Sequence, residues 1–327
     1  MWKRIFILMV VTFLGVSALI IQSASGIEYP TRPIEMYVPY GPGGTNDLMT
    51  RIVADVAQKY VGQPLVVVNK PGGGGAVSAG YLISSKPDGY KTVSLATAFL
   101  SSTIYTQKVP FGPDDLVPVA NFMEFQEGLI VRGDSQWKTL GELLDYAKKN
   151  PGALRWGHPS RGSPLCMNTL LIFRKAGVTG IEVPYLGSAE VLNALLGGHI
   201  DAAAQSYGVM REQLRAGKVR YLCSFSAQRF KEPPNVPTAA ELGFPEATKL
   251  RTFVGVYMHK DTPEDIRKFL FNAFKKTNED PEFQERFEKF GEARVFGGEE
   301  FLKERIKISR EVSIPLLKEF GLYVAGN

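Results

Sequence analysis

The sequence predicts an α/β fold of two lobes, each with a mainly parallel sheet flanked by helices. Short apolar runs alternate along the chain with stretches whose apolar residues recur at helical spacing, as in strand–helix–strand units. Residues 122–130 and 249–257, where the chain could cross between lobes, have strand composition, and neither looks like a flexible linker. With 327 residues, the chain is long enough for two ordinary domains.

The first lobe is expected to comprise residues 27–125 and 248–327. Residues 34–38 predict a strand, and an apolar face over 49–60 predicts a helix that ends at Gly62. Residues 65–68 are all apolar, which is typical of a strand inside a parallel sheet. Further strands are predicted at 90–97 and 249–258, and helices at 262–274, 281–290 and 299–320, the last interrupted near Pro315.

The second lobe is expected to comprise residues 126–247. Thr139 and Glu142 match a capping box at the start of a helix. The other predicted elements are strands at 128–131, 154–157, 181–185, 202–205 and 219–225, and helices at 164–176 and 189–196.

Residues 1–26 have the pattern of a secretory signal peptide. A short basic start is followed by an apolar run over 5–21 and by small residues over 23–26. An uncleaved membrane anchor is the alternative, because the run is near the lower limit for spanning a bilayer. The pattern predicts a periplasmic protein. Export permits a disulfide between Cys166 and Cys223, although two separate buried thiols fit the sequence equally well.

Composition excludes several classes of function. A formal net charge of +5 without a compact basic block is too mild to indicate nucleic-acid binding. The three histidines, at 158, 199 and 259, are scattered, so no metal-ligand spacing is present. We expect no metal, no cofactor and no catalytic residue.

The stretch GPGGTND, residues 41–47, joins a predicted strand to a predicted helix. Glycines allow close backbone approach, and the free N–H groups of a helix N-terminus attract anions. The stretch has no Gly-Lys-Ser/Thr, and Asn46 occupies the last glycine position of Gly-x-Gly-x-x-Gly, so neither nucleotide motif is met. A capped turn without a ligand is the alternative. Asp47 could cap the helix or meet a ligand ammonium or hydroxyl.

Several short motifs occur in a fixed order over nearly the whole chain after residue 28. They are Tyr29-Pro30-x-Arg32-Pro33-Ile34, Val38-Pro39-Tyr40-Gly41-Pro42-Gly43-Gly44-x-x-Asp47, Asn69-Lys70-Pro71-Gly72, Pro184-Tyr185-x-Gly187-Ser188-Ala189, and Val236-Pro237-Thr238-x-x-Glu241-x-Gly243-Phe244-Pro245. Together they resemble the extracytoplasmic solute-binding receptors of tripartite tricarboxylate transporters, or Bug receptors. The resemblance implies a monomeric, two-lobed periplasmic binding protein of type II-like architecture. Such a receptor closes on a small organic carboxylate and delivers it to a membrane permease, without chemistry on it.

The resemblance also implies a pincer around the ligand. One half is the glycine turn, and the other is the turn at 185–189. The implied ligand-binding residues are Tyr40, Gly41, Pro42, Gly43, Gly44, Thr45, Asn46, Asp47, Gly74, Gly75, Ala76, Ser160, Arg161, Gly162, Ser163, Tyr185, Gly187, Ser188, Ala189 and Gln205.

The chain departs from the family pattern at residues 157–166. His158 stands where relatives usually have serine, Ser160 where they have glycine, and Cys166 where a histidine is common. Arg161 could pair with a distal ligand carboxylate, or it could be a solvated loop residue.

Two other functions fit the sequence less well. An exported α/β enzyme acting on an anion would need a nucleophile, but Ser188 lacks a Gly-x-Ser-x-Gly elbow. A ligand-sensing subunit for a membrane kinase would use the same binding site.

Overall fold

The computed structural model describes residues 28–226, 228–230 and 232–324. The expected signal peptide, residues 1–26, lies outside this range. The described residues from Arg32 onward form one compact unit, to which the description below applies. Within the described residues, no helix combines the length and apolar character needed to cross a bilayer.

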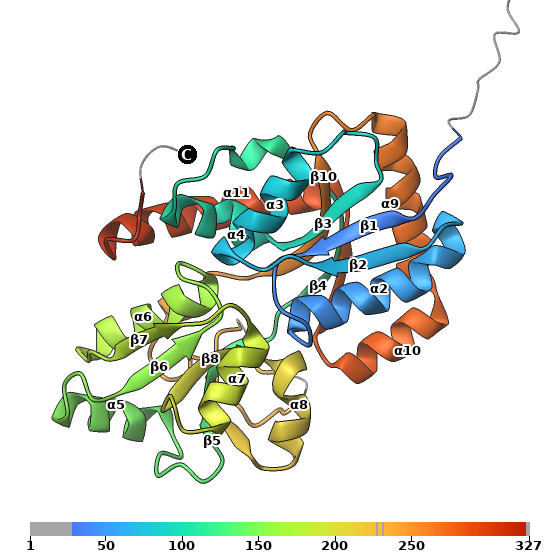
Figure 1. Cartoon of the computed structure of the whole chain (residues 1–327). Helices are drawn as coiled ribbons and strands as arrows, with labels where there is room; N and C mark the ends of the chain where they lie inside the picture. Colours follow the sequence, from blue (N-terminus) through green and yellow to red (C-terminus); the bar gives the residue numbers. More distant parts are fainter. Residues whose placement is uncertain (1–27, 227, 231, 325–327) are drawn as a thin grey trace, which may run out of the picture. The chain divides into compact units, whose positions relative to one another are not determined.

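The first sheet has six strands in the order β11-β4-β10-β3-β1-β2. The strands are β1 (Ile34–Val38), β2 (Leu65–Asn69), β3 (Lys91–Ala96), β4 (Leu116–Glu124), β10 (Phe253–His259) and β11 (Ala293–Gly297). The flanking helices are α2 (Thr45–Val61), α3 (Ala76–Ile83), α4 (Thr97–Ser101), α9 (Glu264–Glu279), α10 (Pro281–Phe290) and α11 (Glu299–Glu319) (Figure 1). Helix α2 packs on α9 and α10, while α11 packs on α4.

The second sheet has five strands in the order β7-β6-β8-β5-β9. They are β5 (Glu127–Arg132), β6 (Arg155–His158), β7 (Ile181–Pro184), β8 (Ala202–Ser206) and β9 (Val219–Ser224). The helices of this lobe are α5 (Leu140–Lys149), α6 (Pro164–Ala176), α7 (Ser188–Leu196) and α8 (Tyr207–Arg215) (Figure 1). Two buried clusters support the lobe, one around Trp156 and Phe173 and one around Leu195 and Tyr207.

The α/β class and the two lobes are confirmed, but the sheets are mixed rather than mainly parallel. In the first sheet β1 is parallel to β2 and β3, whereas β10 is antiparallel to β3 and β4, and β11 to β4. In the second, β6 is parallel to β7 and β8, whereas β5 is antiparallel to β8 and β9. Parallel neighbours need helical crossovers. The chain instead passes from β4 in the first sheet directly into β5 in the second sheet, with only residues 125 and 126 between the two strands.

Other expectations fail locally. Strand β2 lies at a sheet edge, where Val66 is 44% exposed, because an apolar run alone does not distinguish an edge from the interior. Helix α11 continues through Pro315, since buried Leu302, Ile306 and Leu317 hold its face on both sides of the proline. Helix α8 and strand β11 were not expected. Cys166 and Cys223 are both buried and free.

Candidate functional site

A small cavity lies where elements of both lobes meet. Its volume is about 40 Å³. The lining residues come from the first lobe, the second lobe and the segments that join them. They are Tyr40, Gly44, Thr45, Asn46, Ala96, Ala98, Phe125, Glu127, Pro159, Ser160, Ser163, Pro164, Leu165, Ser188, Ser206 and Thr252.

Four helix N-termini contribute to this lining. Gly44 is the N-cap of α2, Ser163 of α6 and Ser206 of α8, and Ser188 is the first residue of α7. Only the cap of α6 among these uses its side chain, which accepts a hydrogen bond from the Cys166 N–H. The first N–H groups of a helix lack intrahelical partners and carry partial positive charge. Their convergence favours a bound anion.

The cavity is polar without being cationic. None of the described residues that line it is Lys, Arg or His. Glu127 supplies a carboxyl group and is 5% exposed. Burial and the nearby Glu127 charge raise the pKa of the Tyr40 phenol to about 12, so this group stays a neutral hydroxyl. An anion here would be held by N–H and O–H donors.

The two halves of the expected pincer come together. Seven predicted residues line the cavity: Tyr40, Gly44, Thr45, Asn46, Ser160, Ser163 and Ser188. A Cβ atom at Gly187 would lie 3.6 Å from the Tyr40 Cβ and 3.7 Å from the Gly41 N. Gln205 lies behind this wall, where its amide donates to the Ser188 carbonyl (2.7 Å) and accepts from the Ser206 N–H (3.0 Å).

The other predicted residues do not line the cavity: Gly41, Pro42, Gly43, Asp47, Gly74, Gly75, Ala76, Arg161, Gly162, Tyr185, Gly187, Ala189 and Gln205. The Arg161 side chain is 62% exposed, and its Nε lies 3.4 Å from the Glu182 carboxylate. Gly74 is close to the wall, since a Cβ there would lie 2.5 Å from the Ser160 Oγ.

Asp47 is buried and fully engaged with protein groups. Its carboxylate accepts from the Gly43 N–H (2.9 Å), from Arg51 Nε (3.0 Å) and from Asn69 Nδ2 (2.8 Å). Burial acts to raise the pKa of Asp47, but these hydrogen bonds outweigh it and keep that pKa below its usual value. Asp47 therefore stabilises the glycine turn through Gly43 and does not line the cavity.

Sequence reasoning missed part of the lining. Phe125 and Thr252 lie on the segments that join the lobes, and Glu127 begins β5 directly after one of them. No local motif marks any of the three. Ser206 could have been found, because its neighbour Gln205 was expected at the cleft. The remaining missed residues are Ala96, Ala98, Pro159, Pro164 and Leu165.

His158, Cys166 and Glu182 form a separate cluster whose potential ligand atoms lie within 4.8 Å of one another. Their identities would suit a soft divalent metal. However, Glu182 already interacts with His158 Nε2 (3.1 Å) and with Arg161. These contacts favour a hydrogen-bonded core cluster over a metal centre.

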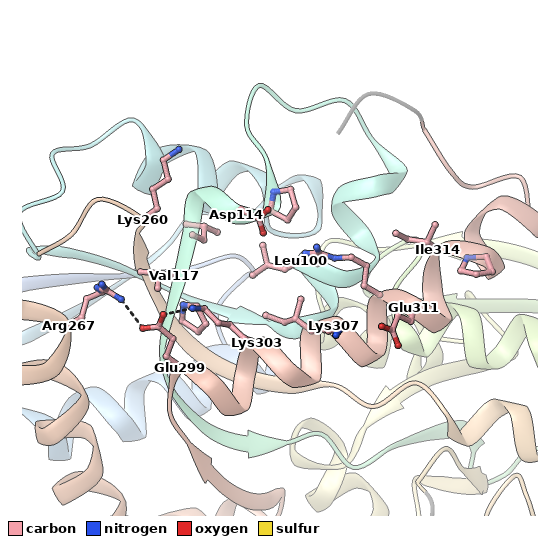
Figure 2. A pocket seen from close by; sticks show the side chains of 16 residues that line it. Leu100, Asp114, Val117, Lys260, Arg267, Glu299, Lys303, Lys307, Glu311 and Ile314 are labelled. Atoms are coloured by element: carbon pink, nitrogen blue, oxygen red, sulfur yellow. Dashed lines mark hydrogen bonds and ion pairs between the residues drawn. The ribbon is translucent and has the colours of Figure 1, made fainter. Parts of the chain in front are cut away.

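A much larger hollow of about 890 Å³ lies on the first lobe, beside α11. Figure 2 shows Glu299 between Arg267 and Lys303. The Glu299 carboxylate lies 2.8 Å from Arg267 Nη1 and 2.6 Å from Lys303 Nζ. Glu299 is thus paired within the wall of the hollow, and no predicted site residue lines the hollow. The interlobe cavity is the stronger candidate.

Comparison with known proteins identifies the family of the chain. Residues 49–322 match the model of the tripartite tricarboxylate transporter family receptor. The chain belongs to this receptor family. A UPF0065 protein of Cupriavidus necator is 36% identical over 278 residues, which are 85% of this chain and 84% of the relative. Receptors of this family are solute-binding proteins of tripartite transporters, and that is the function of the chain.

Two solved structures show the same receptor fold. The periplasmic binding protein BugD superposes with a TM-score of 0.84 at 26% identity, covering 90% of this chain and 99% of BugD. MatC from Rhodopseudomonas palustris, solved with bound malate, superposes with a TM-score of 0.78 at 25% identity. The match covers 87% of this chain and 100% of MatC.

Proposed function

We propose that this receptor captures a small organic carboxylate in the interlobe cavity and delivers it to the permease subunits of a tripartite tricarboxylate-type transporter. The convergence of four helix N-termini on a cavity whose described lining contains no cationic side chain carries the proposal. Backbone N–H groups and hydroxyls bind a carboxylate without a counter-charge. The malate bound to the related receptor MatC supports the same class of ligand.

Binding is proposed to close the lobes on the ligand. Strand membership supports a division into lobe 1 (residues 27–125 and 248–327) and lobe 2 (126–247), with hinges near 125–126 and 248–252. A ligand that contacts both lobes has higher affinity for the closed state and therefore shifts the population toward it.

We further propose that the receptor is an exported, monomeric periplasmic protein that performs no chemistry on its ligand. The described residues of the cavity lining offer hydroxyls, but no histidine that could activate one and no cysteine nucleophile. The neutral Cys166 thiol lies outside the cavity, which weakens the case for a cysteine enzyme.

Titration calorimetry of the ligand-free protein with a panel of small carboxylates tests the proposal. The protein is unfolded and refolded first, to remove any retained ligand. At least one carboxylate is expected to bind and to raise the melting temperature in a concentration-dependent manner. A panel without a single binder would refute carboxylate capture. Loss of uptake in a strain without the receptor would separate transport from sensing.

A further inference from the structure

We infer that Glu127 selects ligands that carry an ammonium group as well as a carboxylate, so that the solute is an amino acid rather than a plain mono- or dicarboxylate. The inference rests on the proposed function, because it takes a carboxylate in the interlobe cavity as given. The inference adds that the ligand carries an ammonium group, which Glu127 binds.

Glu127 is a buried acid in the wall of a binding cavity. It is the first residue of β5, directly after the crossing from lobe 1, and it is 5% exposed. Its side chain accepts one hydrogen bond, from the Thr252 hydroxyl, at a long 3.4 Å. Among the described residues, no lysine or arginine forms an ion pair with it. A carboxylate has about four acceptor positions, so this one long hydrogen bond leaves most of the acceptor capacity of Glu127 unused by the described residues, and Glu127 lines the cavity.

The surroundings of Glu127 add negative rather than positive charge. Burial is the main cause that raises its pKa well above the usual value, and the buried Glu292 raises it further. Glu124 adds to the same effect, although that carboxylate pairs with Arg251. Without a ligand, no described residue supplies this acid with a counter-charge. A ligand cation would provide one and would stabilise the ionised form.

The cavity therefore presents two kinds of polar group to one solute. The N-termini of α2, α6, α7 and α8 provide donors for an anion. Glu127 provides a buried acceptor for a cation. A zwitterion complements both, whereas a second ligand carboxylate beside Glu127 would meet a like charge and would need a proton to bind.

Calorimetry on the wild-type receptor with matched pairs tests this inference. The pairs are alanine with propionate, 4-aminobutyrate with butyrate, aspartate with succinate, and glutamate with glutarate, with both enantiomers of each chiral acid. In every pair that binds, the amino member is expected to bind at least tenfold more tightly. The same pairs are then measured with Glu127→Gln and with the control Glu124→Gln, whose parent carboxylate pairs with Arg251 outside the cavity.

Glu127→Gln is expected to weaken the binding of the amino member at least tenfold and to change the affinity for its desamino partner by less than threefold. Glu124→Gln is expected to preserve both affinities. Equal or tighter binding of the desamino acids by the wild-type receptor would overturn the inference, and this comparison requires no variant to fold. An unchanged preference in a folded Glu127→Gln protein would also overturn it. Binding of desamino acids alone refutes the inference and leaves the proposed function intact, whereas failure of every carboxylate refutes both.

Discussion

The Thr45 hydroxyl lies 2.5 Å from the Ser206 hydroxyl and joins the N-terminus of α2 in one lobe to that of α8 in the other. Both side chains are buried, and both line the cavity. This bond therefore links lobe closure to the site where the ligand is proposed to bind.

Thr45→Val and Ser206→Ala each remove one partner of this bond. Each substitution is expected to weaken ligand binding, because the closed state loses a contact that the open state does not make. A net contribution of about 1 kcal/mol is typical of such a bond. Calorimetric dissociation constants of the two single variants and the double variant should show a coupling energy of that size. Strictly additive effects would mean that the bond does not stabilise the ligand-bound state.

Asp47→Asn is expected to lower the free energy of unfolding by about 1–3 kcal/mol, because Arg51 loses its buried counter-charge. The depressed pKa of Asp47 gives stability that is present above its unfolded pKa and lost as the pH falls through the folded value. The variant should therefore lose part of the acid sensitivity. Urea unfolding at several pH values measures both effects.

Asp55→Asn is the matched control on the same helix, because Asp55 is exposed and pairs with Arg286 at the surface. The Asp55→Asn substitution should lower the free energy of unfolding by less than about 0.5 kcal/mol. An Asp47→Asn protein with unchanged stability and much weaker binding would instead identify Asp47 as a direct ligand contact.

Gly44→Ala should weaken ligand binding about tenfold or more without loss of stability, because the backbone there is extended (φ −75°) and the residue lines the cavity. A Cβ would lie 3.5 Å from the Gly41 carbonyl oxygen, which is ordinary contact. Gly43→Ala should instead lower stability and leave ligand affinity unchanged. Its φ of +79° makes alanine cost about 1 kcal/mol, but Gly43 is exposed and outside the lining. Thermal melts and calorimetry distinguish the two profiles, and equal loss of affinity in both would argue against Gly44 as the contact.

Glu292 is expected to make the receptor less stable as the pH rises. Its carboxylate accepts from the N–H groups of Gln126 and Gly208, each at 2.6 Å, yet burial raises its pKa to about 8. Between the unfolded value of 4.5 and about 8, the folded state retains a proton that the unfolded state has released. The free energy of unfolding should fall over this range, by up to about 1.4 kcal/mol per pH unit from this group.

Glu292→Gln should flatten that slope, measured by urea unfolding between pH 5 and pH 9. Glu288→Gln, an exposed substitution on α10, should retain the wild-type profile. An equally steep slope in Glu292→Gln would assign the effect to another group, such as Glu127.

Local sequence patterns predicted most elements well. Helices α6 and α10 begin and end at the expected residues, since Ser163 and Asp280 cap them, proline follows each cap, and glycine follows each helix. The edge position of β2, the continuity of α11 and the pairing of β5 were not predictable in this way. Each depends on contacts with segments distant in the chain.

By itself, the sequence determined the α/β class, the capped and glycine-ended elements, the two opposing turns and, through its ordered motifs, the receptor family. Spacing and capping are local properties, which is why they can be read along the chain. Only the tertiary structure decided three outcomes. The Asp47 carboxylate is hydrogen-bonded to Arg51 and Asn69, the Arg161 side chain is exposed, and Glu127 lines the cavity. These outcomes depend on which side chains the two sheets bring together, and a carboxylate's role depends on whether its partner is a protein cation or an open cavity.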